Sequence, residues 1–305
     1  MGPILIKKLP LPLIKLEQVI PKDPNDMKCS PHLSFENGSC IPINLLIKMA
    51  DAYNKYSNKS KIDSIIKLDD RLETLYPDEY KRYLLFEFGK RFKGSQHEWI
   101  KHKFSSFMEE DHKEEFKNNI FRPVGPQGKF DWLSTLDINF TLAQYENKYI
   151  DYKFLGAVPI DFADLDYLPF KSLNFDDLVN AGKNRIGVIF NLDEHYKNGS
   201  HWVSLFFDLK KGQIYFSDSY GTKPEDRIIN FISKIEKYLI NNKKILNPDI
   251  RFNRTQHQKG FSECGVYSIN FILRLLKGKT FDHITRKRVT DEKVNKCRMI
   301  YFTKK

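Results

Sequence analysis

The sequence predicts an α+β fold in which a helical N-terminal region precedes a mixed region of helices and strands. Three observations predict it. Apolar residues recur at helical spacing from about residue 41 to 115, short β-branched runs begin after Gly182, and prolines and glycines cluster between the two regions. That cluster, FRPVGPQGKFDW, places a boundary that gives an N-terminal arm and helical accessory domain over 1–120 and a second domain over 121–305.

The first domain is expected to begin with an arm and continue with helices. Residues 1 to about 30 hold several prolines and polar clusters, which is typical of an extended segment. In IPINLLIKMADAYNKY, apolar residues recur three and four positions apart, and Pro42 stands near the first turn. The stretches SIIKLDDRLETLY and DEYKRYLLFEFGKRF repeat the helical pattern, so we expect helices there as well.

The second domain opens with one more helical pattern, from about Ser134 to Tyr149, followed by a loop-rich section that contains GAVPIDF. The run RIGVIFNL predicts a strand. HWVSLFFDLKKGQIYFSDS predicts two strands joined by a hairpin turn around Lys210, Lys211 and Gly212.

Helices and one further strand complete this domain. PEDRIINFISKIEKYLINN begins with a proline and acidic residues and carries one apolar stripe, which predicts an amphipathic helix. DIRFNRTQ is a strand candidate, and a strongly apolar helix is expected from Cys264 to near Gly278. TDEKVNKCRMIYF predicts a last short helix capped by Thr290.

The composition is that of a globular protein and excludes a disordered or fibrous one, and the charge pattern argues against specific nucleic-acid recognition. With 41% hydrophobic and 14% aromatic residues, the chain has a globular composition. Its net charge of +11 attracts anionic partners, but lysines predominate, the charges are scattered, and no nucleic-acid-binding motif is present. We therefore expect at most a weak nucleic-acid contact through the basic surface.

Cysteine usage favours a reducing compartment. Cys29, Cys40, Cys264 and Cys297 are too few and too irregularly spaced for a disulfide framework, and no C-x-x-C pair indicates zinc. Lysines and prolines interrupt the apolar N-terminus, and no other run approaches the ~20 apolar residues of a membrane span. The sequence thus predicts a soluble intracellular protein without a membrane span.

One group of residues indicates cysteine chemistry. A cysteine nucleophile needs a base, a group that orients the base, and donors for the developing oxyanion. His201 stands at the start of one hairpin strand, Asp218 at the end of the next, and Gln258 lies six residues before Cys264. The hairpin predicts that His201 and Asp218 lie close together, so that the carboxylate accepts the ring N–H.

The position of Cys264 supports this interpretation. We expect an exposed thiol at the start of a helix, where the helix dipole and a nearby imidazolium favour the thiolate. Gly265 would leave room for an acyl group, and the Gln258 amide would stabilise the oxyanion together with the Cys264 backbone N–H.

Other mechanisms fit the sequence less well. GFSECG places Cys264 where a serine elbow around Ser262 requires glycine, and papain-like enzymes place cysteine before histidine in the chain. A zinc site built from His257, Cys264 and His283 lacks a spaced ligand pair. The other cysteines and histidines are interpreted as structural or surface residues.

HWVSLFFDLKKGQIYFSDS followed by QKGFSECG resembles the SUMO-specific, ubiquitin-like-protein-specific and adenovirus (adenain) cysteine proteases. The seventeen-residue separation of His201 from Asp218 and the six-residue separation of Gln258 from Cys264 match the SUMO-protease branch. WLSTLDI is similar to its Trp-Leu-x-Asp-x-x-Ile segment, although Thr135 replaces the Asp. The resemblance covers about residues 120–305 and is strongest to the polyprotein-processing proteases of African swine fever virus and related large DNA viruses.

This resemblance implies a papain-like cysteine protease core that needs no cofactor or metal. It assigns residue roles: nucleophile Cys264, general base and then acid His201, orienting group Asp218, oxyanion donor Gln258 (with Gln256 as a rival), and substrate-binding residues Trp202, Trp132 and Gly265. Its substrates would be extended segments that end in small residues, typically Gly-Gly.

The expected role is processing of viral structural precursors during virion maturation, at assembly sites in the host cytoplasm and in the virion. Two alternatives remain open at this point. One is an isopeptidase that removes ubiquitin-like modifiers from conjugates, and the other is an inactive scaffold that binds Gly-Gly tails or nucleic acid.

Overall fold

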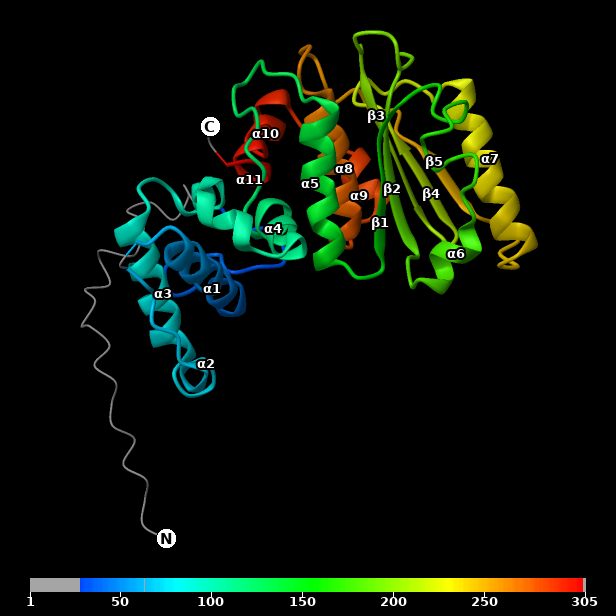
Figure 1. The fold of residues 1–305 in the computed structure, drawn as a ribbon. Coiled ribbons are helices and arrows are strands. Elements are labelled where there is room, and N and C mark those ends of the chain that lie inside the picture. The colour runs from blue at the N-terminus through cyan, green and yellow to red at the C-terminus, as the bar shows by residue number, and fades with distance from the viewer. Residues whose placement is uncertain (1–27, 63, 304–305) are drawn as a thin grey trace. The chain divides into compact units, whose positions relative to one another are not determined.

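The computed structural model describes residues 28–62 and 64–303 (Figure 1). The chain divides into two compact units, the first ending at Arg122 and the second beginning at Pro123. Most of the extended arm expected over residues 1 to about 30 lies outside the described residues.

The first unit is helical and has an apolar core of its own. Aromatic side chains such as Tyr80, Phe88 and Phe104 are fully buried in it. Its helices are α1 (Ile43–Lys59), α2 (Asp70–Leu75), α3 (Pro77–Arg91), the 3₁₀ segments η3 (Gln96–Lys101) and η4 (Lys103–Phe107), α4 (Glu110–Glu115) and the π segment η5 (Phe116–Ile120).

The helix expected in SIIKLDDRLETLY begins later than predicted. The Asn54 side chain accepts from the backbone N–H of Ile66 at 2.7 Å and donates to its carbonyl at 2.8 Å, which holds this part of the chain in an irregular, non-helical conformation. Asp69 then caps the helix by accepting from the backbone N–H of Arg71. The two side chains together account for the start of the helix at Asp70.

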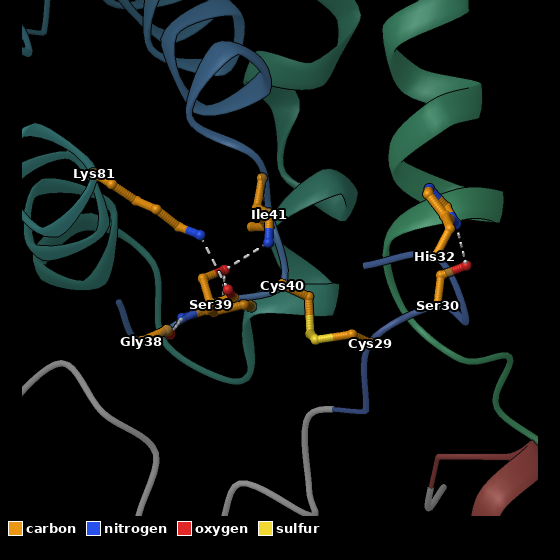
Figure 2. The surroundings of a disulfide bond; sticks show 9 residues. Cys29, Ser30, His32, Gly38, Ser39, Cys40, Ile41 and Lys81 are labelled. Carbon is orange, nitrogen blue, oxygen red and sulfur yellow. Dashed lines mark hydrogen bonds between the residues drawn. A yellow bond between two sulfur atoms is a disulfide. The ribbon is translucent and has the colours of Figure 1, made fainter. Parts of the chain in front are cut away.

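Two of the four cysteines form a disulfide, so the expectation of unpaired cysteines is wrong for Cys29 and Cys40 (Figure 2). Their Cα atoms lie 5.2 Å apart, although eleven positions separate them in the sequence. Beside the bridge, Ser39 accepts from the Ile41 backbone N–H and from the Lys81 ammonium. The disulfide therefore belongs to a hydrogen-bonded segment just before α1.

A tight turn helps to shape this segment. Asn37 and Gly38 both have positive φ, at 53° and 89°, and the backbones of Glu36 and Ser39 exchange two hydrogen bonds. This is the Asn-Gly two-residue hairpin turn. Because the turn reverses the chain between the two cysteines, it helps to bring them close enough to form the disulfide.

We predict that replacing Cys29 and Cys40 with alanine lowers the free energy of unfolding by about 2 to 3 kcal/mol, because the unfolded chain regains the entropy of an eleven-residue loop. Chemical denaturation with and without dithiothreitol checks this. The two proteins should differ under oxidising conditions and agree in reductant. A variant that matched the wild type under oxidising conditions would contradict the prediction.

The second unit is built on a five-stranded mixed sheet with the spatial order β1-β2-β3-β4-β5 (Figure 1). The central strands β2, β3 and β4 are antiparallel, and each outer strand is parallel to its neighbour. The strands are β1 (Tyr152–Pro159), β2 (Arg185–Asn191), β3 (Trp202–Asp208), β4 (Gln213–Ser217) and β5 (Asp249–Phe252).

Strand β1 occupies the section that we expected to be loop. Gly156 and Pro159 are residue types typical of loops. In the structure the glycine lies at φ 108° in a β-bulge, where the register shifts between Phe154 and Ala157. The Asn139 side chain accepts from the Ala157 backbone N–H at 2.7 Å and ties the strand to helix α5.

Helices cover both faces of this sheet. In Figure 1, α5 and α8 lie on one face and α7 lies on the other. Each face has its own apolar core. The helices are α5 (Thr135–Lys148), α6 (Phe175–Asn180), α7 (Asp226–Asn241), α8 (Cys264–Leu276), α9 (Phe281–Thr285), α10 (Asp291–Asn295) and α11 (Arg298–Tyr301). The α+β fold class is confirmed.

The last predicted helix is divided in two. Thr290 caps α10 as expected, accepting from the Lys293 backbone N–H, but this helix ends at Asn295 and α11 follows. In the described part of the chain, no helix is long and apolar enough to cross a membrane.

Candidate active site

The β3–β4 hairpin brings His201 and Asp218 together. His201 immediately precedes β3 and Asp218 immediately follows β4, and Ser204 is paired with Ser217 near that end of the ladder. The imidazole Nε2 lies 2.7 Å from Asp218 Oδ1. Both side chains are largely buried, 12% and 4% exposed, so water competes little for this hydrogen bond.

Cys264 starts helix α8, and its side chain lies near enough to His201 to help raise the pKa of that imidazole. With Nε2 engaged by Asp218, Nδ1 is the ring nitrogen that is left to exchange a proton with the thiol. The backbone N–H of Cys264 lies in the first turn, where N–H groups have no partner within the helix. The thiol, the imidazole and the carboxylate therefore lie together, and the imidazole is hydrogen-bonded to the carboxylate.

The expectation of an exposed thiol is wrong, because Cys264 is only 1% exposed. It packs in the core that lies between α5, α8 and the sheet, which includes Leu133 and Trp202. A thiolate and an imidazolium interact more strongly in such a water-poor site than on an open surface.

The His201 imidazole favours its protonated form. Burial alone would lower its pKa, but the hydrogen bond to Asp218 and the nearby Asp218 and Cys264 side chains outweigh burial and raise the pKa of His201 to about 9. An imidazolium beside a cysteine stabilises the thiolate. The site therefore holds a cation next to the sulfur, where a cysteine nucleophile needs one.

Gln258 is fully buried beside the histidine–aspartate pair. Its Oε1 accepts from the hydroxyl of Ser219, the residue after Asp218, and its Nε2 donates to the Gly260 carbonyl at 3.0 Å. Its backbone N–H donates to the Ser219 carbonyl. Gln256, the rival for the same role, is exposed.

The predicted substrate-binding residues differ in exposure. Trp202 is 6% exposed, and its indole N–H donates to the Leu133 carbonyl at 3.0 Å, so it supports the site from within the core. Trp132 is half-exposed. A Cβ on Gly265 would lie 3.0 Å from Leu133 Cβ. The glycine therefore permits close packing of α8 against Leu133.

Sequence reasoning missed a fully buried arginine. Arg298 donates to three backbone carbonyls, those of Asp131 at 2.6 Å, Ser262 at 3.3 Å and Pro126 at 3.3 Å. One guanidinium thus connects the loop before Trp132 with the loop before Cys264. An arginine within the apolar stretch CRMIYF was the only signal in the sequence.

The same network accounts for Glu263, which precedes the cysteine. Arg298 Nε donates to Asn295 Oδ1 at 2.8 Å, and Asn295 Nδ2 donates to Glu263 Oε1 at 3.1 Å. The other carboxylate oxygen accepts from the Ser262 backbone N–H. Glu263 therefore braces the loop that ends at Cys264.

The remaining candidates lie outside this arrangement. His257 is buried, and its Nδ1 accepts from the Val289 backbone N–H at 3.0 Å, which is a structural role. Cys297 is half-buried, and burial raises the pKa of its thiol. Among the described residues, no group of three or more His, Cys, Asp or Glu side chains is arranged to hold a metal ion.

A cysteine, a histidine and an aspartate arranged in this way on an α+β core define a thiol-dependent hydrolase. The model of the Ulp1 protease family, C-terminal catalytic domain, matches residues 180–305. A protein of Acanthamoeba polyphaga mimivirus that is named a putative thiol protease is 38% identical over 286 residues, covering 90% of this chain and 92% of its own.

Two further comparisons agree. An African swine fever virus protein named SUMO-1 cysteine protease is 26% identical over 200 residues, 60% of this chain and 71% of its own. The crystal structure of a protease from African swine fever virus superposes with a TM-score of 0.61 at 17% identity, covering 92% of this chain and 97% of that one. The chain belongs to the Ulp1 protease family and is a cysteine protease of the kind that large DNA viruses encode.

Proposed function

We propose that Cys264 is the nucleophile and that His201 carries its proton. The Cys264 sulfur bonds to the substrate carbonyl carbon, the C–N bond breaks, and the His201 imidazolium protonates the leaving amine. His201 then removes a proton from water, the water attacks the thioester, and the thiolate is released. The observation that carries the proposal is the buried His201–Asp218 hydrogen bond next to the Cys264 side chain.

The oxyanion of the tetrahedral intermediate needs donors that are already in place. Gln258 is positioned for this role because its amide is held at both ends, at Oε1 by Ser219 and at Nε2 by Gly260. The Nε2 group has a second N–H, and the backbone N–H of Cys264 is the other candidate donor.

We further propose that the substrates are viral structural precursors cut after small residues, of the Gly-Gly-Xaa type, during virion maturation. This would place the protease at assembly sites in the host cytoplasm and in the virion. The similarity to proteases of two large DNA viruses supports this choice. A weak nucleic-acid contact through the basic surface stays a prediction.

The name of the African swine fever virus relative, SUMO-1 cysteine protease, favours a second candidate, removal of ubiquitin-like modifiers. Incubating wild type and Cys264→Ala with viral precursors and with modifier conjugates, then sequencing new N-termini, separates the two. Cleavage of precursors after Gly-Gly supports the first, and release of modifiers alone supports the second. No cleavage of either would favour the inactive scaffold.

The alkaline limit of activity should depend on the charge of Asp218. Wild-type activity should fall around pH 9, where the His201 imidazolium loses its proton. Asp218→Asn still accepts the ring N–H but carries no charge, so the imidazolium is less stable. The midpoint of this fall should therefore move from about 9 toward 6.5, the usual histidine pKa. The measurement is kcat/KM as a function of pH.

The second histidine–aspartate pair supplies a matched control. His195 Nδ1 lies 2.5 Å from Asp161 Oδ2, outside the candidate active site. Asp161→Asn should leave the alkaline midpoint where it is in the wild type. If Asp218→Asn also left it unchanged, Asp218 would not support the imidazolium.

A further inference from the structure

Tyr220 contacts the candidate site in three ways. Its ring stacks on the His201 imidazole, with 4.8 Å between centroids and 28° between planes. Its backbone N–H donates to Asp218 Oδ1 at 2.9 Å, the same oxygen that pairs with His201. Its hydroxyl donates to the Gly260 carbonyl at 2.9 Å. None of these contacts belongs to the roles assigned above.

The hydroxyl contact reaches the oxyanion side of the site. The Gly260 carbonyl also accepts from Gln258 Nε2 at 3.0 Å, so Tyr220 and Gln258 share one acceptor. Holding this carbonyl fixes the direction of the Gln258 amide. Tyr220 is thus linked to the imidazole on one side and to the proposed oxyanion donor on the other.

The backbone around Tyr220 is itself held in place. The Gly221 N–H donates to the Asp218 carbonyl, which closes a turn around Tyr220, and Gly221 has φ 77°. A Cβ on Gly221 would lie 2.9 Å from the Arg254 carbonyl oxygen, so the turn packs closely on the next loop. The position of the Tyr220 ring is therefore set by the fold.

An aromatic face next to an imidazolium stabilises its positive charge. The charged groups that face His201 are Asp218 and Cys264, and both favour the protonated ring. Burial raises the pKa of the Tyr220 phenol, and the nearby Cys264, Asp218, Glu263 and Asp291 side chains raise it further. The phenol therefore stays neutral and keeps its proton for Gly260.

We propose that Tyr220 is a positioning residue that stabilises the His201 imidazolium through its ring and aligns Gln258 through its hydroxyl. This inference rests on the proposed function, because it assumes that Cys264 and His201 form the reactive pair. Two substitutions separate the two contacts. Tyr220→Phe keeps the aromatic face and loses the hydroxyl, whereas Tyr220→Leu keeps apolar cover over the imidazole and loses both.

The first measurement needs no substrate. Iodoacetate is an anion that the imidazolium attracts, so the rate at which it alkylates Cys264 should fall as His201 loses its proton. The protein carries Cys297→Ser, which removes the other free cysteine. We expect the alkylation rate to fall with the same alkaline midpoint in the protein with Tyr220 and in Tyr220→Phe. In Tyr220→Leu this midpoint should be about half a pH unit lower.

The second measurement is kcat and KM on a Gly-Gly-Xaa peptide. Tyr220→Phe should lower kcat about fivefold with KM unchanged, because one hydrogen bond that aligns Gln258 is lost. A Tyr220→Leu variant with the wild-type midpoint, or a Tyr220→Phe variant with the wild-type kcat, would overturn the proposal. If the protein with Tyr220 intact showed no alkaline fall at all, the reactive pair, and with it the proposed function, would be at fault.

Discussion

Cys264→Ala should abolish peptidase activity, with kcat lowered on the order of 10⁴-fold or more. Alanine has no group that can form the thioester, and neither the oxyanion donors nor His201 can replace it. The fold should survive, because alanine is smaller than cysteine and retains the Cβ of this residue at the start of α8. Single-turnover cleavage of a Gly-Gly-Xaa peptide and the far-ultraviolet circular dichroism of both proteins check these two expectations.

Cys297→Ala is the matched control for this loss. Cys297 is the other free cysteine in the described residues, and it contacts Asn270 instead of a histidine. Its replacement should leave kcat within about twofold of the wild type, since it takes no part in the proposed chemistry. Cleavage by Cys264→Ala at the normal rate would rule out the thioester mechanism.

Arg298→Met should be the most destabilising single substitution in the second unit. Methionine approximates the length of the arginine side chain but leaves the carbonyls of Pro126, Asp131 and Ser262 without their buried donor. Breaking a buried charged network of this kind costs about 3 to 5 kcal/mol. Chemical denaturation should show that decrease in the free energy of unfolding.

Lys296→Met separates this effect from the simple loss of a positive charge. Lys296 is 74% exposed and pairs with the exposed Glu292, so its replacement should change stability by less than about 0.5 kcal/mol. Equal effects of the two substitutions would mean that the Arg298 hydrogen bonds contribute little. Residual activity of Arg298→Met should also be low, because the loop before Cys264 loses its brace.

The sequence predicted those parts of the site that depend on local geometry. A hairpin with a short turn leaves few registers, so the proximity of His201 and Asp218 followed from the strand pattern alone. The start of α8 at Cys264 was visible as the onset of an apolar helical run. In both cases the structure depends on residues that are close together in the chain.

The features that sequence reasoning missed depend on distant partners. Arg298 bonds to carbonyls 172, 167 and 36 positions away, and backbone carbonyls have no sequence signature. The burial of Cys264 depends on packing against Leu133, more than a hundred positions earlier. Strand β1 was missed because its bulge requires a glycine, which also marks loops.

Labelling with a Gly-Gly peptide chloromethyl ketone, which forms a stable thioether as chloride leaves, followed by peptide mapping, tests most directly whether Cys264 and His201 form the reactive pair. Cys264 and Cys297 are both free in the described residues, so the protein carries its own internal comparison. We predict one adduct per chain, on Cys264, that forms far more slowly in His201→Ala and is absent in Cys264→Ala. Equal labelling of Cys297, or undiminished labelling of Cys264 in His201→Ala, would contradict this account of the site.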